Sequence, residues 1–361
     1  ARVAARRLAA TGIASPLMPA GPKRAAKATL ADVARRAGVH KATASRVISS
    51  PEKISPATTQ RVRAAMEALG YVSNGVARAL ATRRTWTIGS IIPTLDNAIY
   101  AVSTNSLERR LEQAGYVLLV ACHEFNLDAE TRALDAFLGR GVDGVVLVGR
   151  EHAPATLARL KASAVPHVFT WGRAAGNPLT VGFDNRRAGR LAAAHLLELG
   201  HRRIAMVAGL LAGNDRASAR LAGVRDAMRA AGLELPDASV VQRAYSLECG
   251  ADGFAELMGA KKLKPTAVIC GNDVLALGAM REARTRAVDV PRDVSIIGFD
   301  DMPMARVVTP ELSTVHFPMA EVGWNAAELL LGLLGEDVGS VQRDLPISLA
   351  ARGSTAAPRR R

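Results

Sequence analysis

Cysteine, aromatic residues and long apolar runs are all scarce in this sequence. Its 361 residues include only Cys122, Cys249 and Cys270, an odd number without the close spacing of metal ligands. They predict neither a disulfide framework nor a zinc site, and they suit a reducing cytoplasm as small buried apolar side chains. No uninterrupted apolar stretch approaches the roughly 18 residues of a membrane span. Hydrophobic residues still make up 49% of the chain, enough for a substantial core in two or three domains.

Acidic residues are almost absent from residues 1–84. That segment holds 16 lysines and arginines against Asp32, Glu52 and Glu67, a net charge of +13, whereas the whole chain carries +14. The remaining residues are therefore close to neutral. A basic segment on a near-neutral body is typical of a protein that binds a polyanion. An anionic membrane surface is the alternative partner, but no basic amphipathic helix of sufficient length is present, so nucleic acid is favoured.

Recognisable catalytic motifs are also missing. The sequence has no Gly-Lys dipeptide, which excludes a phosphate-binding P-loop, and neither a Gly-x-Ser-x-Gly nor a His-Glu-x-x-His pattern. His123-Glu124 lacks a second histidine on the next turn, and the seven histidines show no nucleophile–base arrangement in the sequence. We therefore expect no enzymatic activity, no metal and no cofactor.

Residues 29–73 have the pattern of a helix-turn-helix DNA-binding domain. Thr29 and Asp32 form a capping box ahead of an apolar periodic run, and Gly38-Val39 ends this first helix. A second short helix begins at about His40, and Ser55-Pro56 suits the start of a third. In a helix-turn-helix the second helix enters the major groove, so double-stranded DNA is the expected partner.

Residues 29–73, called the head below, are flanked by segments of different composition. Residues 1–28 contain no acid and are rich in Ala, Arg and Pro; we expect a disordered basic tail rather than a transit peptide. Residues 74–85 predict a hinge, with a very short helix over 76–81 that would form only against DNA or a second copy of itself. Residues 357–361 form a short basic C-terminal tail.

Residues 86–356 show a different pattern, an alternation of strands and helices. Near-continuous Val/Ile/Leu runs predict buried parallel strands at 87–92, 116–121, 144–149, 166–171, 203–208, 267–270 and 294–300. Helices are expected between them, at 103–114, 128–138, 186–199, 215–231 and 272–286. The alternation predicts two doubly wound parallel-sheet lobes with a cleft between them. The expected fold class is therefore α/β, with an all-α helix-turn-helix head.

Polar and aromatic residues follow the ends of several predicted strands, where ligands bind in such folds. Arg220, one turn into a helix, and Tyr245, after a strand expected near 239–242, join them in the candidate ligand site. Its residues are Pro93, Asn97, Trp171, Arg220, Tyr245, Asn272 and Asp300. Alternatively, Asn272 and Asp300 cap the helices that follow, as Asp273 or Asp301 is expected to do, and Trp171 belongs to the core.

Two long stretches of the head, TLADVARRAGVHKATASRVI and ISPATTQRVRAAMEALGYVSNGVARALA, resemble the lactose-repressor (LacI) family of bacterial transcription regulators. The resemblance implies base contacts in the major groove from Lys41, Ala42 and Arg46, and a minor-groove wedge from Leu80. It implies contacts to phosphates from Thr29, His40, Thr43, Ser45, Ser55, Thr58 and Asn74. The family usually has serine in place of His40 and proline in place of Ser73, which alters that phosphate contact and loosens the hinge.

Residues 86–356, called the core below, resemble the effector-binding domain of the same family, which is itself similar to periplasmic sugar-binding proteins. The matching stretches include HLLELGHRRIAMVAG, GNDVLALGAM and VPRDVSIIGFDD. The resemblance implies that Arg220, Asn272 and Asp300 hold ligand hydroxyls or a carboxylate, and that Tyr245 and Trp171 line the walls. The family often has aromatic residues after the first strand, where this chain has Asn97-Ala98-Ile99-Tyr100. Lys41, SPEKIS and VGFDN resemble the gluconate-type branch.

Together these observations predict a cytoplasmic, homodimeric transcriptional regulator, most simply a repressor, that binds a pseudo-palindromic operator and no membrane. A small sugar or sugar acid bound between the lobes would control its operator affinity. A nucleoside is the alternative ligand. The alternative protein classes are a sugar-binding transport component, which would have no DNA-binding head, and a two-lobed α/β enzyme.

Overall fold

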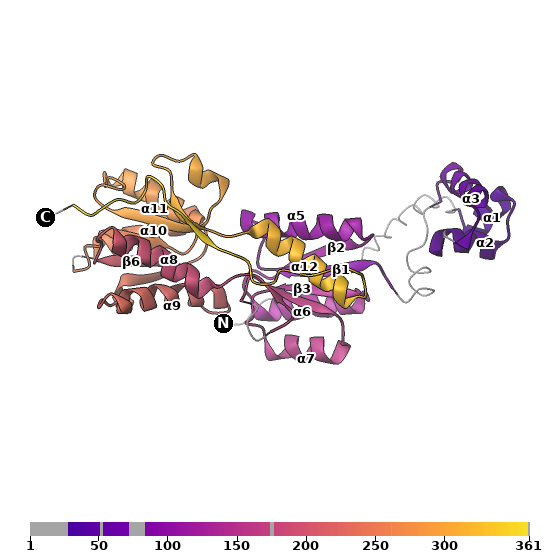
Figure 1. The fold of residues 1–361 in the computed structure, drawn as a ribbon, viewed down its shortest axis with the longest axis horizontal. Coiled ribbons are helices and arrows are strands. Elements are labelled where there is room, and N and C mark those ends of the chain that lie inside the picture. The colour runs from indigo at the N-terminus through magenta and orange to yellow at the C-terminus, as the bar shows by residue number, and fades with distance from the viewer. Residues whose placement is uncertain (1–27, 51–52, 72–83, 174–176, 261, 360–361) are drawn as a thin grey trace, which may run out of the picture. The chain divides into compact units, whose positions relative to one another are not determined.

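The computed structural model of the chain (Figure 1) divides into two compact units, the second of which begins at Arg84. The structure describes residues 28–50, 53–71, 84–173, 177–260 and 262–359. Most of the expected basic tail lies outside the described residues, and so does the hinge helix over 76–81 with Asn74 and Leu80. These elements therefore stay predictions.

The described part of the first unit consists of helices around a small apolar core. Helix α1 (Leu30–Ala37) begins at the predicted capping box, in which the side chains of Thr29 and Asp32 each accept a hydrogen bond from the other's backbone N–H. It ends at Gly38, whose φ of +63° is a conformation that glycine adopts readily. Helices α2 (Lys41–Ser49) and α3 (Pro56–Ala68) follow, and Ser55 caps α3 as expected. The buried side chains are Val33, Ala34, Ala37, Ala44, Val47, Val62 and Ala65.

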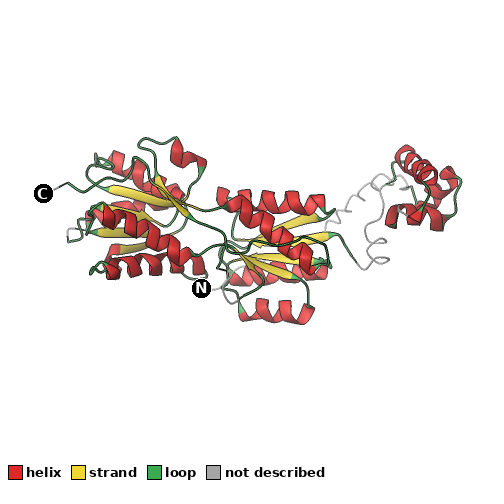
Figure 2. Ribbon diagram, in the orientation of Figure 1, coloured by secondary structure: helices red, strands yellow, loops and turns green. Residues whose placement is uncertain are grey.

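Lobe 1 of the second unit contains a parallel sheet, whose strands are yellow in Figure 2, and the strand order is β2-β1-β3-β4-β5. Its strands are β1 (Thr87–Ile92), β2 (Val117–Cys122), β3 (Gly144–Val148), β4 (His167–Thr170) and β5 (Thr180–Val181). Its helices are α5 (Ala98–Gln113), α6 (Leu127–Gly139), α7 (Pro154–Ser163) and α12 (Met319–Leu333). Helices α5 and α12 pack together on one face of the sheet, and α6 and α7 on the other.

Lobe 2 contains a sheet with the order β11-β10-β9-β8-β6-β7, parallel except for the β10–β11 pair. Its strands are β6 (Ile204–Gly209), β7 (Val240–Arg243), β8 (Ala267–Cys270), β9 (Ser295–Asp300), β10 (Ser313–His316) and β11 (Ser348–Ala350). Its α-helices are α8 (Asn185–Glu198), α9 (Asp215–Ala230), α10 (Leu247–Gly259) and α11 (Asp273–Thr285). The pair α8–α9 covers one face and α10–α11 the other.

The expected fold class is confirmed, and each strand predicted from an apolar run is present within one or two residues. The sequence analysis did not place α7, α10, α12, β10 or β11. Helix α12 is the most informative omission, because it follows the strands of lobe 2 in the sequence yet packs against α5 and β4 of lobe 1. None of the helices in the described ranges is long and apolar enough to cross a lipid bilayer.

The lobes are joined by three crossing segments within the described residues: 182–185, 316–319 and 334–347. The first and third pair with each other, since the Gly182 N–H donates to the Arg343 carbonyl at 2.9 Å and the Leu345 N–H donates to the Gly182 carbonyl at 2.7 Å. A Cβ on Gly182 would collide with Gly172. The crossings therefore form a compact junction close to the carboxyl ends of both sheets.

Close helix packing in lobe 2 depends on glycine. A Cβ added to Gly223 in α9 would collide with the backbone of Arg186 in α8, and one on Gly189 would collide with the backbone of Arg220. The two helix backbones can approach this closely only because neither position carries a side chain.

We expect Gly223→Ala to destabilise the core by ~1–3 kcal/mol, because the added methyl group must push α8 away from α9. The matched control is Gly139→Ala at the end of α6, where a Cβ would meet nothing within 4 Å. That change should be neutral or stabilising by ~0.5–1 kcal/mol. Urea unfolding of both variants measures the difference, and equal stabilities would contradict the packing argument.

Candidate functional site

Helix α2 presents a polar face that is open to solvent. Lys41, Ala42, Ser45 and Arg46 are exposed, whereas Ala44 and Val47 on the opposite face are buried in the head. Residues spaced by three and four positions share one side of a helix, so the predicted base-reading residues lie together. The predicted phosphate residue Thr43 borders this face and is half-buried.

His40 has a structural role that the sequence analysis did not predict. Its Nδ1 accepts a hydrogen bond from the Ala42 N–H at 3.3 Å, so the imidazole is the N-cap of α2. Only Nε2 is then left to contact a phosphate, as a donor. Other predicted phosphate residues also act in caps: Ser55 Oγ accepts from the Thr58 N–H, and its hydroxyl bonds to Thr58 Oγ1 at 3.0 Å.

The predicted ligand residues gather at the carboxyl ends of the strands of both lobes. In lobe 1, Pro93 follows β1, Asn97 caps α5, and Trp171 follows β4; all three are buried. In lobe 2, Asn272 follows β8 and Asp300 ends β9, with exposed fractions of 1% and 0%. Trp171 has a φ of +67° and Asp300 a φ of +112°, and such backbone strain in bulky or charged residues is typical of functional sites.

Several buried polar atoms of this region lack a hydrogen-bond partner among the described residues. They include Nε of Arg220, Nδ2 of Asn272, both carboxylate oxygens of Asp300, Oδ1 of Asn185 and both ring nitrogens of His123. Buried polar groups are normally paired, because an unpaired one loses its hydration without compensation. A donor-rich guanidinium and amide close to a carboxyl group suit a ligand that carries hydroxyl or carboxylate groups.

Aromatic rings form one wall of the site. Ring centroids are separated by 5.2 Å between Tyr100 and Trp171, 5.9 Å between Trp171 and Phe183, and 4.2 Å between Phe183 and Phe317. The Arg220 guanidinium carbon lies 5.3 Å from the Phe299 ring centroid, within the range of a cation–π interaction. Phe183 and Phe317 belong to two of the crossing segments, so this wall spans the junction of the lobes.

Tyr245 extends the site on the side of lobe 2. Its hydroxyl lies 3.4 Å from Nη2 of Arg220 and 3.3 Å from Nδ2 of Asn214. A Cβ on Gly209, at the end of β6, would collide with the Tyr245 hydroxyl. The ring centroid of Tyr245 is also 6.0 Å from that of Phe125 in lobe 1, so this residue contacts both lobes.

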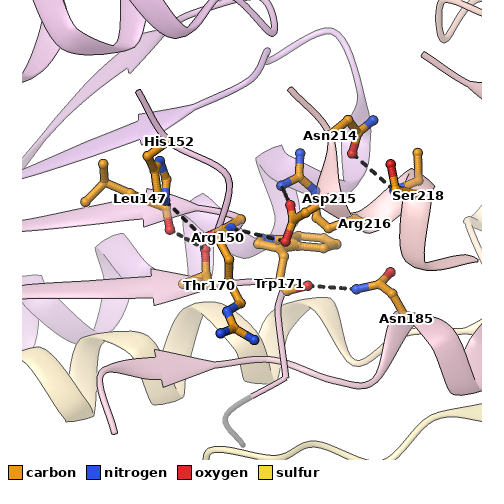
Figure 3. Close-up of polar contacts among 12 residues, drawn as sticks. Leu147, Arg150, His152, Thr170, Trp171, Asn185, Asn214, Asp215, Arg216 and Ser218 are labelled. Atoms are coloured by element: carbon orange, nitrogen blue, oxygen red, sulfur yellow. Dashed lines mark hydrogen bonds and ion pairs between the residues drawn. The ribbon is translucent and has the colours of Figure 1, made fainter. Parts of the chain in front are cut away.

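Sequence reasoning missed a further group of buried residues in the same region: Tyr100, His123, Asn185, Asn214 and Arg216. Asn185 donates to the Trp171 carbonyl at 2.8 Å (Figure 3) and so supports the strained backbone there. Burial lowers the pKa of His123 and raises that of Tyr100. The signals in the sequence were the positions of these residues: His123 follows a predicted strand, Arg216 lies one helical turn before Arg220, and Tyr100 lies in the stretch where the family often has aromatic residues.

The expectation that Asp273 or Asp301 caps a helix is wrong, because Asn272 caps α11 through Oδ1. Asp273 instead accepts hydrogen bonds from the Thr314 hydroxyl at 2.7 Å and the Met302 N–H at 2.8 Å. Although burial opposes it, hydrogen bonds from Arg352 and Arg306 lower the pKa of Asp301. Asp300 caps nothing; burial, with the nearby charge of Asp273, raises its pKa well above the usual value.

Comparison with known proteins gives matches over both units. A model of the bacterial regulatory proteins of the lacI family matches residues 29–74, and a periplasmic binding protein-like domain matches residues 193–355. The chain is 33% identical over 329 residues to catabolite control protein A of Priestia megaterium, covering 91% of this chain and 99% of that protein. It is 34% identical over 330 residues to the ribose operon repressor of Escherichia coli (strain K12), covering 91% and 99%. The solved lac repressor dimer bound to operator and the anti-inducer ONPF matches with a TM-score of 0.80 at 28% identity, covering 91% of this chain and 99% of that one.

Replacing Asp273 by asparagine should make the stability of the core less dependent on pH. Burial raises the pKa of Asp273 to about 7, so folding favours the protonated form. The stabilisation is present at low pH and is lost as the pH rises from the usual aspartate range through about 7. Relative to Asp273→Asn, the wild-type chain should lose up to about 1.4 kcal/mol per pH unit in that window. Urea unfolding at about pH 5 and about pH 7.5 measures this. Identical pH dependence in both chains would contradict the assignment.

Proposed function

The chain belongs to the lacI family of bacterial regulatory proteins, and we propose that it is a dimeric repressor controlled by a small ligand bound between its core lobes. The single observation that supports ligand binding is the cluster of buried polar atoms of Arg220, Asn272 and Asp300 that have no partner among the described residues. Asn272 and Asp300 lie at the carboxyl ends of the neighbouring strands β8 and β9, and Arg220 reaches the same region from α9, with its guanidinium beside the Phe299 ring. The proposal that the chain binds DNA is supported by its family membership and by the exposed polar face of α2.

The basic head is the operator-binding part. Lys41 and Arg46 lie on the exposed face of α2, where a planar guanidinium can make a bidentate pair with guanine O6 and N7. His40 Nε2 and the exposed N-termini of α1 and α3 would position the head on phosphates. Leu80, Asn74 and the rest of the hinge would complete the contact at the operator centre. Because the protein acts on DNA, we place it in the cytoplasm.

The ligand is proposed to be a sugar or a sugar acid. Hydroxyl groups can satisfy Asn272 Nδ2 and Asp300, while the apolar face of a sugar ring packs against Trp171 or Tyr245. Arg220, whose Nε is unpartnered, suits a carboxylate. A nucleoside remains the alternative ligand, favoured by the number of aromatic rings. The similar proteins are regulators rather than enzymes, which supports the expectation that the site binds without catalysis.

Two apolar surfaces of the core support a homodimer. In lobe 2 the exposed side chains of Leu247 and Met304 border a groove of about 500 Å³ beside α10 and α11. In lobe 1 the exposed apolar side chains include Val102 on α5 and Val117 and Val120 on β2. Exposed apolar patches of this kind are typical of interaction surfaces, and a two-fold dimer buries the same patch on both subunits. Such a dimer presents two heads to a pseudo-palindromic operator.

Arg46→Ala should relax sequence discrimination at one position of each half-site. Loss of a bidentate base contact should cost about 1–3 kcal/mol for the preferred sequence and much less for sequences altered at that position. Selection of duplexes from a random pool, followed by binding titrations, measures both effects. Arg63→Ala, an exposed arginine on α3, is the control. An unchanged base preference would refute the reading role of Arg46.

Arg220→Met should abolish the response to ligand while leaving operator affinity intact. Methionine keeps an apolar side chain against the Phe299 and Phe317 rings but removes the guanidinium. A thermal-shift screen of the wild-type chain against sugars, sugar acids and nucleosides identifies the ligand. Saturation at 100 times the dissociation constant should stabilise the fold by ~2.7 kcal/mol.

The matched control is Arg229→Ala, on the same helix but with a side chain that is 76% exposed. It should respond to the ligand like the wild-type chain. If Arg220→Met is stabilised by the same ligand at the same concentration, Arg220 has no part in the binding site.

A further inference from the structure

The two lobes touch where β3 of lobe 1 ends and α9 of lobe 2 begins (Figure 3). The Arg150 N–H donates to Oδ2 of Asp215 at 3.2 Å, and Oδ1 of Asp215 pairs with Nη1 of Arg216 at 2.9 Å. Gly149 lies so close to Arg216 that an added Cβ would collide with the guanidinium. A single backbone donor of lobe 1 therefore makes a charge-assisted hydrogen bond to lobe 2.

The peptide group between Gly149 and Arg150 also contacts a buried pair of side chains, His152 and Glu130, through its carbonyl oxygen. Gly149 supplies the carbonyl and Arg150 the N–H of one planar unit, in which the two groups point in opposite directions. Nε2 of His152 lies 3.2 Å from that carbonyl oxygen, and Nδ1 lies 3.0 Å from each carboxylate oxygen of Glu130. Both side chains are only 1% exposed. Fixing the carbonyl on this side directs the N–H toward Asp215.

Both ring nitrogens of His152 face oxygen atoms. Nδ1 faces the Glu130 carboxyl group and Nε2 faces the Gly149 carbonyl oxygen, so the ring links that carboxyl group to the peptide. A buried ion pair is rarely more stabilising than apolar side chains of the same volume. The pair therefore needs an explanation other than stability, and its contact with the Gly149 carbonyl supplies one.

The backbone around this peptide is otherwise poorly constrained. Gly149 has a φ of +91°, a conformation open to glycine, and the side chains of Arg150 and Glu151 are exposed. The Gly149 N–H donates to the Thr170 carbonyl at 2.9 Å, which anchors the preceding peptide to β4. The hydrogen bond from His152 anchors the following one.

We propose that Glu130 and His152 are positioning residues for this interlobe contact. They orient the Gly149–Arg150 peptide so that its N–H reaches Asp215, and they thereby bias the balance between arrangements of the two lobes. The contact follows from the geometry of the core alone. Its effect on operator binding rests on the function proposed above.

The rival explanation is that the pair only supports the local packing of lobe 1. The double variant Glu130→Leu/His152→Phe separates the two explanations, because it replaces the ion pair by apolar side chains of similar size. Phenylalanine keeps a ring beside Phe169, whose centroid lies 4.9 Å from that of His152. The fold should be as stable as the wild type, while the Gly149 carbonyl loses its donor.

Hydrogen exchange of the Arg150 amide, measured at single-residue resolution in the full-length chain, reports directly on the contact. In the double variant it should exchange about tenfold faster than in the wild type, with the amides of β1 and β3 unchanged. Asp215→Ala should give the same increase, and the combination of all three changes should add nothing further. Asp237→Ala, which removes an exposed ion pair of lobe 2, is the control and should leave Arg150 unchanged.

Unchanged exchange at Arg150 in the double variant would overturn the proposal, as would an equal increase throughout lobe 1. The second readout is affinity for a duplex selected with the wild-type chain, which should change by at least about threefold in the double variant. Unchanged affinity together with faster exchange would overturn the link to DNA binding. If the wild-type chain selects no duplex, the proposed function fails, and the exchange measurement still decides whether the contact exists.

Discussion

The carboxyl ends of the parallel strands of two sheets lie at the junction where the chain crosses between the lobes, and the rest of the core depends on this constraint. Residues 182–185, 316–319 and 334–347 cross there, and backbone hydrogen bonds join the first to the third. Loops after parallel strands point to one edge of a sheet, so two such edges bring side chains from distant parts of the sequence together. Pro93 and Trp171 in lobe 1, and Asn272 and Asp300 in lobe 2, follow or end strands at these two edges.

The junction contains a buried positive charge, the guanidinium of Arg220. The Arg220 guanidinium lies over the Phe299 and Phe317 rings, and its contact with the Tyr245 hydroxyl is long, at 3.4 Å. Desolvating a charge is costly unless partners compensate it, so a ligand that supplies oxygen acceptors gains more here than in water. Because Phe183 and Phe317 belong to crossing segments, the proposed ligand site would connect its occupation to the arrangement of the lobes.

The sequence was sufficient for the elements whose pattern is local. Continuous apolar runs located the buried strands, and cap residues such as Thr29, Ser55 and Gly38 located the helices of the head. Helix α12 could not be assigned to lobe 1 in this way, because its partner α5 lies more than two hundred residues earlier. Nor could the sequence show that Glu130 and His152 are in contact in the interior, or that Asp273 accepts hydrogen bonds from Met302 and Thr314. Those contacts depend on tertiary packing, which overrides local preference.

The central claim is that one free-energy coupling connects the interlobe site to DNA. It is tested most directly by measuring the affinity of a ligand, identified among sugars, sugar acids and nucleosides, for the free chain and for the chain saturated with its selected operator. Linkage requires that ligand and operator change each other's affinity by the same factor. The account predicts a difference between the two dissociation constants of about 5- to 150-fold. Equal dissociation constants would show that the ligand site does not control operator binding, and would contradict the account.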